Sequence, residues 1–167
     1  VLALVYASDG QYAKAMEVFA RLDSMDLPDD ESLSETFYMQ YADVCEKSRN
    51  PGRAEEVLVK CIKLYPECDQ ALNYLAYTWA DRGTNLDLAF DYVTKALAIE
   101  PANGAYVDTL GWIWFKRKEY GKALELVEKA EKLMGVDPVV ADHVGDICEA
   151  MGNRQAALEA WTRSFML

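Results

Sequence analysis

Alanine recurs along this chain at a nearly fixed interval. Ala54, Ala89, Ala123 and Ala157 follow one another at steps of 35, 34 and 34 residues, and Ala15 lies 39 residues before the first of them. A period near 34 residues is typical of stacked helix–turn–helix units, each of which needs its neighbours to bury its apolar face. Where two helices cross closely, the space holds little more than a methyl group. The interval therefore predicts a solenoid of helix pairs.

Other positions recur in the same phase. A small residue stands twelve positions before four of these alanines, and a larger apolar residue stands four positions after every one of them. Four positions are one helical turn along the same face. The small residues are Ala3, Ala42, Gly111 and Gly145, and the larger ones are Phe19, Leu58, Val93, Val127 and Trp161. Pro66 and Pro101 each follow an alanine by twelve positions, where a helix must end.

This combination resembles the tetratricopeptide repeat (TPR), and the resemblance extends over nearly the whole chain. It implies an all-α fold, a right-handed α–α superhelical solenoid of about five helix pairs. We expect a single solenoid domain over residues 1–167. Its units are expected at residues 1–28, 34–67, 68–102, 104–137 and 138–167.

Departures from the period fall between the expected helices. Extra residues around Asp26–Ser34 predict a longer exposed turn, before a helix that is capped by Ser32 or Ser34. The third unit carries one extra residue near Gly83–Asn85, and the fourth has a longer exit at Met134–Pro138. Insertions belong in turns because a helix interior would have to rotate its apolar stripe to absorb them.

Both ends of the chain are apolar, at Val1–Tyr6 and Phe165–Leu167. Solenoids normally finish with a polar capping helix. We therefore interpret the sequence as a fragment of a longer protein. A further expectation is self-association, in which these apolar ends stack on another copy of the chain.

The formal net charge of −11, from 28 acidic and 17 basic residues, narrows the choice of partners. Nucleic-acid binding needs a cationic face, which no cluster of lysine or arginine supplies. Anionic membrane surfaces are disfavoured for the same reason, and no apolar run reaches the ~20 residues that would form a transmembrane segment. The acidic balance favours basic or mixed-charge protein partners.

Neither a metal site nor a cofactor site is expected. Cys45, Cys61 and Cys148 occupy positions that the repeat fills with small or medium apolar residues, so we expect buried free thiols. A disulfide between Cys45 and Cys61, on the two helices of one unit, is the alternative. The cysteine spacing and the single histidine argue against tetrahedral zinc.

Catalytic motifs are also missing from the sequence: it has no glycine-rich phosphate loop, GxSxG motif or HExxH motif. The one histidine, His143, lies between Asp142 and Asp146, and we interpret it as a groove or surface residue with acidic neighbours. A catalytic base needs a nucleophile within reach, and the sequence offers none beside it. We therefore expect that this protein is not an enzyme.

In the TPR family the first helix of each unit lines a concave groove, which implies a partner-binding surface here. The expected groove residues are Asn73, Tyr77, Asp108, Trp112, Phe115, Lys116, Asp142 and Asp146. With Leu110 and Trp114 in core positions, we expect Trp112 and Phe115 to point away from the core and to anchor a partner. The alternative is that Trp112 packs between repeats.

Chaperone-binding TPR domains hold a carboxyl-terminal tail with lysines, an arginine and asparagines along this groove. Apart from Asn73, these residues are absent from the expected groove here. A peptide with basic and aliphatic or aromatic side chains is the better complement. Leu72–Leu167 further resembles bacterial secreted and outer-membrane lipoprotein TPR scaffolds, some of them adaptors for carboxyl-terminal processing proteases. That resemblance implies a periplasmic location, whereas the free thiols favour the cytoplasm.

Two functions follow. The first is a non-catalytic scaffold or adaptor that binds a peptide or partner segment in its groove. The alternative is a regulatory or targeting module of a larger enzyme or secretion assembly.

Overall fold

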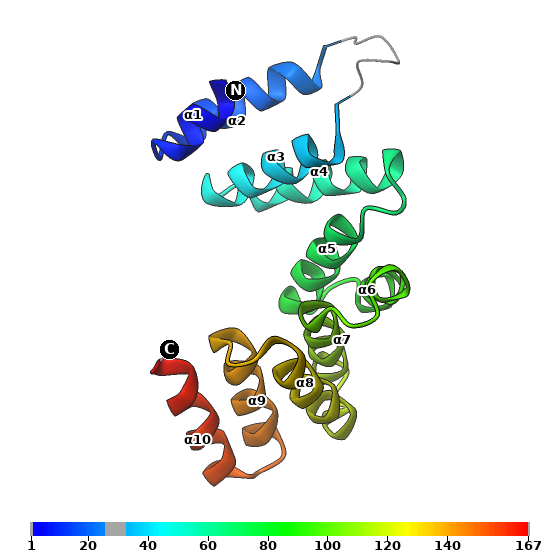
Figure 1. Cartoon of the computed structure of the whole chain (residues 1–167), viewed down its shortest axis with the longest axis vertical. Helices are drawn as coiled ribbons and strands as arrows, with labels where there is room; N and C mark the ends of the chain where they lie inside the picture. Colours follow the sequence, from blue (N-terminus) through cyan, green and yellow to red (C-terminus); the bar gives the residue numbers. More distant parts are fainter. Residues whose placement is uncertain (1, 26–32, 167) are drawn as a thin grey trace. The chain divides into compact units, whose positions relative to one another are not determined.

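The computed structural model describes residues 2–25 and 33–166, and every regular element in these residues is a helix (Figure 1). In chain order the helices are α1 (Leu2–Ser8), α2 (Tyr12–Asp23), α3 (Glu35–Lys47), α4 (Pro51–Leu64), α5 (Asp69–Arg82), α6 (Leu86–Ile99), α7 (Gly104–Lys116), α8 (Tyr120–Met134), α9 (Pro138–Ala150) and α10 (Arg154–Phe165). Successive helices pack as pairs, α1 on α2, α3 on α4, α7 on α8 and α9 on α10. The predicted all-α fold of helix pairs is confirmed.

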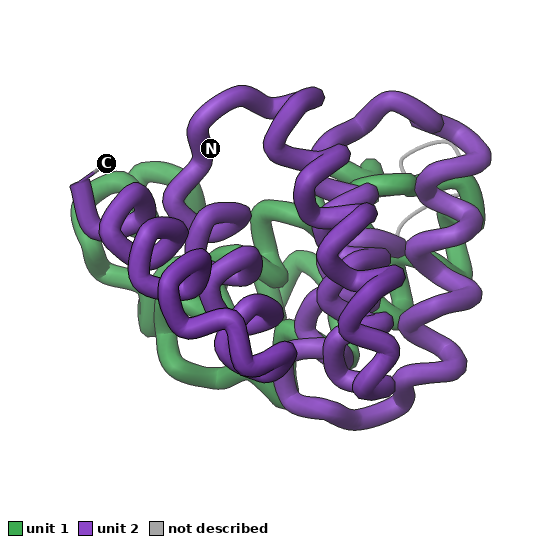
Figure 2. Tube along the Cα trace, turned by 90° about the horizontal axis from the view of Figure 1, so that it is seen from below, with its two compact units in different colours: residues 1–71 green, residues 72–167 purple. Residues whose placement is uncertain are grey.

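The chain divides into two compact units, Val1–Ala71 and Leu72–Leu167 (Figure 2). The division falls inside the first turn of α5, four residues into the third expected repeat. Unit 1 contains α1 to α4, and unit 2 contains most of α5 and all of α6 to α10. The expectation of one continuous solenoid domain stays a prediction.

Polar side chains fix where many of the helices begin. The Ser34 hydroxyl accepts a hydrogen bond from the backbone N–H of Phe37, so Ser34 is the cap of α3. Asn50, Asn103 and Asn153 cap α4, α7 and α10 in the same way. Each cap satisfies an N–H group that the first helical turn leaves without a partner. The longer turn expected before Ser34 lies mostly in residues 26–32, outside the described residues.

Close helix crossings depend on the recurring small residues. Ala15, Ala54, Ala89, Ala123 and Ala157 are all at most 1% exposed. The small residue twelve positions before the alanine is a glycine on α7 and on α9, and the space there is even tighter. A Cβ atom on Gly111 of α7 would lie 2.6 Å from a methyl of Val127, and one on Gly145 of α9 would overlap the ring of Trp161.

Cys45, Cys61 and Cys148 are buried free thiols, as the repeat pattern predicted, and Cys68 is a buried free thiol as well. Burial raises the pKa of Cys45 to about 11 and that of Cys61 to about 12. Near neutral pH both side chains are therefore neutral thiols that act as small apolar groups.

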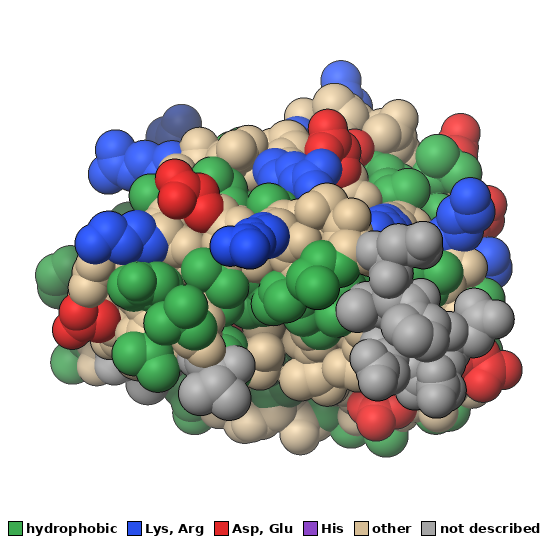
Figure 3. Space-filling view, turned by 90° about the horizontal axis from the view of Figure 1, so that it is seen from above, with side chains coloured by type: hydrophobic (Ala, Val, Ile, Leu, Met, Phe, Trp, Pro, Cys, Tyr) green, Lys and Arg blue, Asp and Glu red, His purple; other side chains and the backbone are tan. Residues whose placement is uncertain are grey.

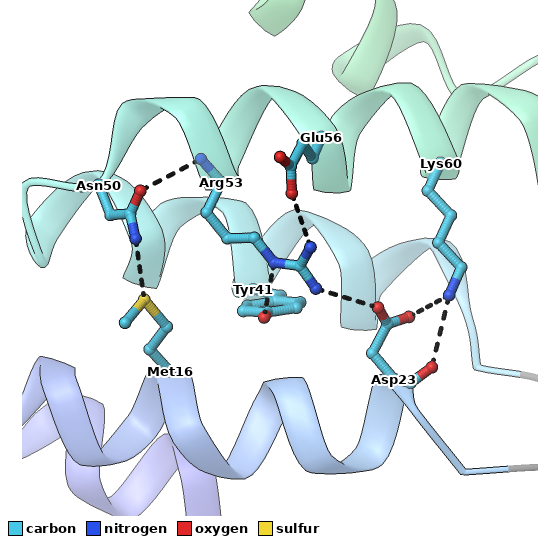
Figure 4. Close-up of polar contacts among 7 residues, drawn as sticks. All are labelled: Met16, Asp23, Tyr41, Asn50, Arg53, Glu56 and Lys60. Carbon is cyan, nitrogen blue, oxygen red and sulfur yellow. Dashed lines mark hydrogen bonds and ion pairs between the residues drawn. The ribbon is translucent and has the colours of Figure 1, made fainter.

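A polar network joins α2 to α4 in unit 1 (Figure 4). The Asp23 carboxylate, at the end of α2, accepts a hydrogen bond from Lys60 and lies 3.5 Å from the Arg53 guanidinium. Arg53 also donates to the Tyr41 hydroxyl at 3.1 Å and to Glu56 at 2.7 Å. The Asp23 side chain is only 10% exposed, so it is the least solvated charge of the network.

Overpacking at the α7–α8 crossing is expected to destabilise unit 2. Gly111→Ala places a methyl against Val127 and near the Ala123 carbonyl, and should lower the free energy of unfolding by about 1–3 kcal/mol. The matched control is Gly121→Ala on α8, where a Cβ meets nothing within 4 Å. That variant should be unchanged or slightly more stable, because alanine is the better helix former. Urea unfolding followed by circular dichroism compares the two, and equal stabilities would contradict the tight crossing.

Loss of the Asp23 carboxylate should destabilise unit 1. Asp23→Ala leaves Arg53 and Lys60 without their shared partner, and we expect a cost of about 1–2 kcal/mol because both cations stay partly solvated. Asp43→Ala is the control, since its pair with Lys47 is about half exposed on both sides. An exposed i,i+4 pair contributes about 0.5 kcal/mol or less. Thermal unfolding that ranks Asp43→Ala as the more damaging change would refute this assignment.

Candidate functional site

Unit 2 contains a groove of about 470 Å³. Its lining comes from the first helices of three successive pairs, α5, α7 and α9, with one residue from α10. The lining residues are Tyr77, Asp81, Trp112, Pro138, Val139, Asp142, His143, Asp146 and Ser164. Four of the eight sequence-predicted groove residues therefore line one concavity, namely Tyr77, Trp112, Asp142 and Asp146.

Beneath the groove a histidine and an aspartate form a buried pair. The Nδ1 atom of His143 on α9 lies 3.0 Å from each carboxylate oxygen of Asp108 on α7. Because an ionised carboxylate can only accept hydrogen bonds, Nδ1 is the donor. Asp108 is 5% exposed and His143 is 4% exposed. The pair therefore joins two neighbouring repeats through a contact with almost no solvent.

This geometry corrects the interpretation of both residues. His143 lines the groove, as one of the two expectations had it, but it is buried and its partner is Asp108, one repeat earlier, rather than Asp142 or Asp146. Asp108, in turn, does not present its carboxylate on the groove surface. Sequence neighbours on a helix point in different directions, whereas residues 35 positions apart occupy equivalent positions on adjacent repeats.

The Trp112 side chain is also buried, at 5% exposure. Its indole stacks on the His143 ring, with centroids 4.0 Å apart, and on the Phe115 ring at 4.6 Å. The expectation that Trp112 points away from the core is wrong, and the alternative of inter-repeat packing holds. Trp114, which we had expected in the core, is only half-buried. Trp112 nevertheless lines the groove.

The other expected residues lie around this stack. Phe115 is half-buried and packs against the core of unit 2. The Lys116 ammonium lies 4.6 Å from the centre of the Trp112 ring and donates to the Asp81 backbone carbonyl at 2.9 Å. Asn73 is half-buried, and its side-chain oxygen has no hydrogen-bond partner among the described residues. None of the three lines the groove.

Three carboxylates give the groove its electrostatic character. Asp81 and Asp142 are exposed, and Asp146 is half-buried. Within residues 2–25 and 33–166, no lysine or arginine side chain forms an ion pair with any of the three. Asp146 has one neutral donor, the indole N–H of Trp161, at 3.2 Å from one of its oxygens. Three carboxylates therefore line the groove without an ion pair to a lysine or arginine of the described residues.

The pKa of the Tyr77 hydroxyl is affected by burial and by these carboxylates. Burial raises the pKa of Tyr77, and neighbouring carboxylates raise it further because they disfavour a second negative charge. Those carboxylates belong to Asp81, Asp108 and Asp142. Tyr77 thus remains a neutral hydroxyl that faces an acidic surface.

Sequence reasoning missed Pro138, Val139 and Ser164 in the groove wall. Pro138 and Val139 precede Asp142 by four and three positions, so helical spacing could have placed them on the same face. Ser164 comes from the second helix of its pair, and its hydroxyl donates to the Pro138 carbonyl at 2.8 Å. No periodic signal in the sequence marks that contact.

Unit 1 has a second groove, of about 460 Å³. Its wall includes Met39 and Asp43 of α3, with Cys68, Asp69 and Gln70 at its other side. Asp43 already pairs with Lys47 at 2.8 Å, so this groove is partly neutralised. The groove in unit 2 is therefore the stronger candidate site.

Other kinds of site find little support in the described residues. No group of three or more histidine, cysteine, aspartate or glutamate side chains there is arranged to share a metal ion. Likewise, none of the helices described has both the length and the hydropathy that crossing a bilayer requires.

Apolar side chains are exposed at both ends of the described chain. Leu2, Leu4 and Val5 of α1 are 43–56% exposed, and Figure 3 shows hydrophobic side chains gathered on the face that lies at the top of Figure 1. At the other end Phe165 is 93% and Met166 is 79% exposed. Self-association through these ends stays a prediction.

Comparison with known proteins identifies the repeat. Residues 35–68 match the tetratricopeptide repeat family. A TPR repeat-containing protein of Pseudomonas aeruginosa, PA4667, is 31% identical over 103 residues, which are 62% of this chain and 17% of that protein. Human mitochondrial import receptor subunit TOM70 is 29% identical over 118 residues, 68% of this chain and 18% of TOM70. The resemblance to TPR proteins is thereby confirmed, and the chain spans less than a fifth of the length of these relatives.

Solved structures agree on the architecture. A crystal structure of MamA covers 99% of this chain and 94% of its own, with a TM-score of 0.76 and 17% identity. MamA of Desulfovibrio magneticus RS-1 covers 99% of this chain and 90% of its own, with a TM-score of 0.76 and 19% identity. At this level of identity the likeness shows the fold alone, which is the TPR-type helical solenoid.

The buried pair should make a large contribution to the stability of unit 2. His143→Phe keeps a ring to stack on Trp112 but leaves the Asp108 carboxylate buried without its partner. We expect the free energy of unfolding to fall by about 3 kcal/mol or more, the cost of an uncompensated buried charge. Asp142→Asn, one residue away and exposed, should change it by less than about 0.5 kcal/mol. Equal urea midpoints for the two variants would mean that the pair does not join α7 to α9.

Proposed function

We propose that this TPR solenoid is a non-catalytic scaffold or adaptor, and that the groove of unit 2 holds a segment of another protein. The observation that carries the proposal is the groove itself. Three first helices each contribute side chains to one concavity, and its three aspartates form no ion pair with a lysine or arginine in residues 2–25 and 33–166. A preformed groove needs little rearrangement to bind, which lowers the entropic cost of holding a partner.

The chemistry around His143 supports a non-catalytic role. Its Nδ1 atom is engaged by Asp108, and the side chain is 4% exposed, so a substrate has little access to it. The four thiols are buried, and burial keeps their pKa values raised, which disfavours the thiolate that a nucleophile needs.

The groove surface indicates what kind of segment fits. Asp81, Asp142 and Asp146 complement basic side chains and would repel the carboxylate of a chain terminus. At the start of α9, Pro138 and the half-exposed Val139 form an apolar margin beside these acids. A segment that combines basic with aliphatic or aromatic residues matches both features.

The length of the relatives supports a second candidate function. They are more than five times as long as the matched segments, so the helix pairs described here can belong to a larger assembly. One relative is named as an import receptor subunit, and a receptor recognises other proteins. A regulatory or targeting module of a larger enzyme or secretion assembly is therefore the alternative, and it would use the same groove.

Charge reversal in the groove tests the binding function. The protein and its Asp142→Lys variant are used for affinity capture from the cells that produce it, and the recovered proteins are compared by quantitative mass spectrometry. A groove partner should be recovered about tenfold less with the variant, because like charges at an interface cost several kcal/mol.

The matched control is Asp91→Lys on α6, an exposed aspartate outside the groove lining. It makes the same charge change to the whole protein, so it should retain the partner. If both variants recover every partner as the unchanged protein does, the groove of unit 2 is not the binding surface.

A further inference from the structure

We propose that Cys61 and Cys68 of unit 1 are an oxidisable dithiol, which a small neutral peroxide converts to a disulfide between the end of α4 and the start of α5. The site belongs to unit 1, so it is independent of the function proposed for the groove of unit 2. It is a covalent modification site rather than a binding surface.

The first argument is that the two thiols are in contact. Cys61 lies in the last turn of α4, and Cys68 immediately precedes α5. Two backbone hydrogen bonds hold the turn between them, from the Tyr65 N–H to the Cys61 carbonyl at 2.7 Å and from the Cys68 N–H to the Tyr65 carbonyl at 3.1 Å. The Cys61 thiol donates a hydrogen bond to the Cys68 sulfur. The two sulfur atoms are therefore neighbours in the folded chain, so a bond between them needs only a local movement.

The second argument is the position of Cys68 at a helix N-terminus. Its sulfur accepts a hydrogen bond from the backbone N–H of Ala71 in the first turn of α5, as a capping side chain does. Burial raises the pKa of Cys68, but the hydrogen bonds from Ala71 and Cys61 oppose that effect because they favour the thiolate. At Cys61 burial and the neighbouring Cys68 both act to raise the pKa, to about 12. Cys68 is thus the thiol that ionises first and acts as the nucleophile.

The third argument is access. Cys68 is 3% exposed and lines the unit 1 groove of about 460 Å³, whereas Cys61 is 0% exposed. The carboxylates of Glu35, Asp43 and Asp69 line the same groove. Negative charge there disfavours an anionic oxidant such as oxidised glutathione, and the limited exposure of the sulfur favours a small one. Hydrogen peroxide is both small and neutral.

The reaction takes two steps, and its atoms and electrons balance. The Cys68 thiolate attacks one oxygen of hydrogen peroxide and the O–O bond breaks, which leaves a sulfenic acid and a hydroxide that takes the Cys68 proton. The Cys61 sulfur then attacks the Cys68 sulfur, the S–O bond breaks, and the leaving hydroxide takes the Cys61 proton. Two thiols are oxidised to one disulfide, and one peroxide is reduced to two waters. Reduction by an added dithiol restores both thiols.

Burial also determines how such a site responds. Because the raised pKa of Cys68 keeps its thiolate scarce near neutral pH, the oxidation is slow and stoichiometric. The dithiol therefore responds to sustained exposure to peroxide, and its chemistry agrees with a non-catalytic protein.

Peptide mapping of the oxidised protein tests the proposal. The protein is treated with excess hydrogen peroxide, circular dichroism checks that it stays folded, the remaining thiols are alkylated, and trypsin cuts after Lys60, Lys63 and Arg82. We expect peptides 61–63 and 64–82 to be recovered as one cross-linked species, two hydrogens lighter than their sum, which dithiothreitol separates. Folded, treated protein without this cross-link would overturn the proposal, and so would a cross-link of Cys61 to Cys45.

Cys148 is the matched control within the same chain. It is 5% exposed and lines a groove of about 410 Å³, and none of the residues that line that groove is a second cysteine. We expect Cys148 to be oxidised at least about tenfold more slowly than Cys68, because susceptibility follows thiolate character as well as exposure. Equal rates at the two cysteines would contradict the advantage assigned to the start of α5.

Variants assign the two roles. In Cys61→Ala the oxidation should stop at a sulfenic acid on Cys68, which dimedone traps, whereas in Cys68→Ser the Cys61 thiol should stay reduced. Cys45→Ala should form the cross-link as the unchanged protein does. Dimedone capture at Cys61 rather than Cys68 would reverse the assigned order, and faster cross-linking by oxidised glutathione than by peroxide would refute the choice of oxidant.

Discussion

The structure of this protein depends on close helix crossings that only alanine or glycine permits. At Gly111 the wall of the crossing is a methyl of Val127, and at Gly145 it is the ring of Trp161. Helices that approach so closely exclude water from their interface and fix the direction in which their other faces point. Because the same crossing recurs at each repeat, successive first helices of unit 2 present equivalent faces to one surface. The groove is a consequence of that repetition.

Polar contacts specify the register between neighbouring repeats, which uniform apolar packing does not. The Asp108–His143 pair joins equivalent positions of α7 and α9, and the Asp23 network joins α2 to α4 in unit 1. Buried or half-buried charges of this kind are costly unless their partners are in place. They therefore favour one register between neighbouring repeats over others. In unit 2 the same pair also holds Trp112 in the wall of the groove.

The candidate site could be predicted in part. Helical spacing placed Tyr77, Asp142 and Asp146 on one surface, since these side chains extend from exposed faces of first helices. It failed for Asp108, which does not line the groove, and for the exposure of Trp112, because the pattern cannot distinguish a residue that faces solvent from one that faces the next repeat. Residues that face solvent and residues that face the next repeat recur with the same spacing in the sequence. The partner of His143 could not be predicted from the sequence either. Its sequence neighbours are acidic, but the aspartate that it contacts lies 35 residues earlier.

The sequence by itself determined the helix pairs, their caps and the buried small residues, because these follow from local spacing and from the size of one side chain at each crossing. Ser34 as the cap of α3 and the free, buried cysteines were within reach for the same reason. Only the tertiary structure decided which groups of adjacent repeats meet. The burial of Trp112, the pairing of Asp108 with His143 and the meeting of three carboxylates in one groove depend on distances across repeats, which no period in the chain encodes.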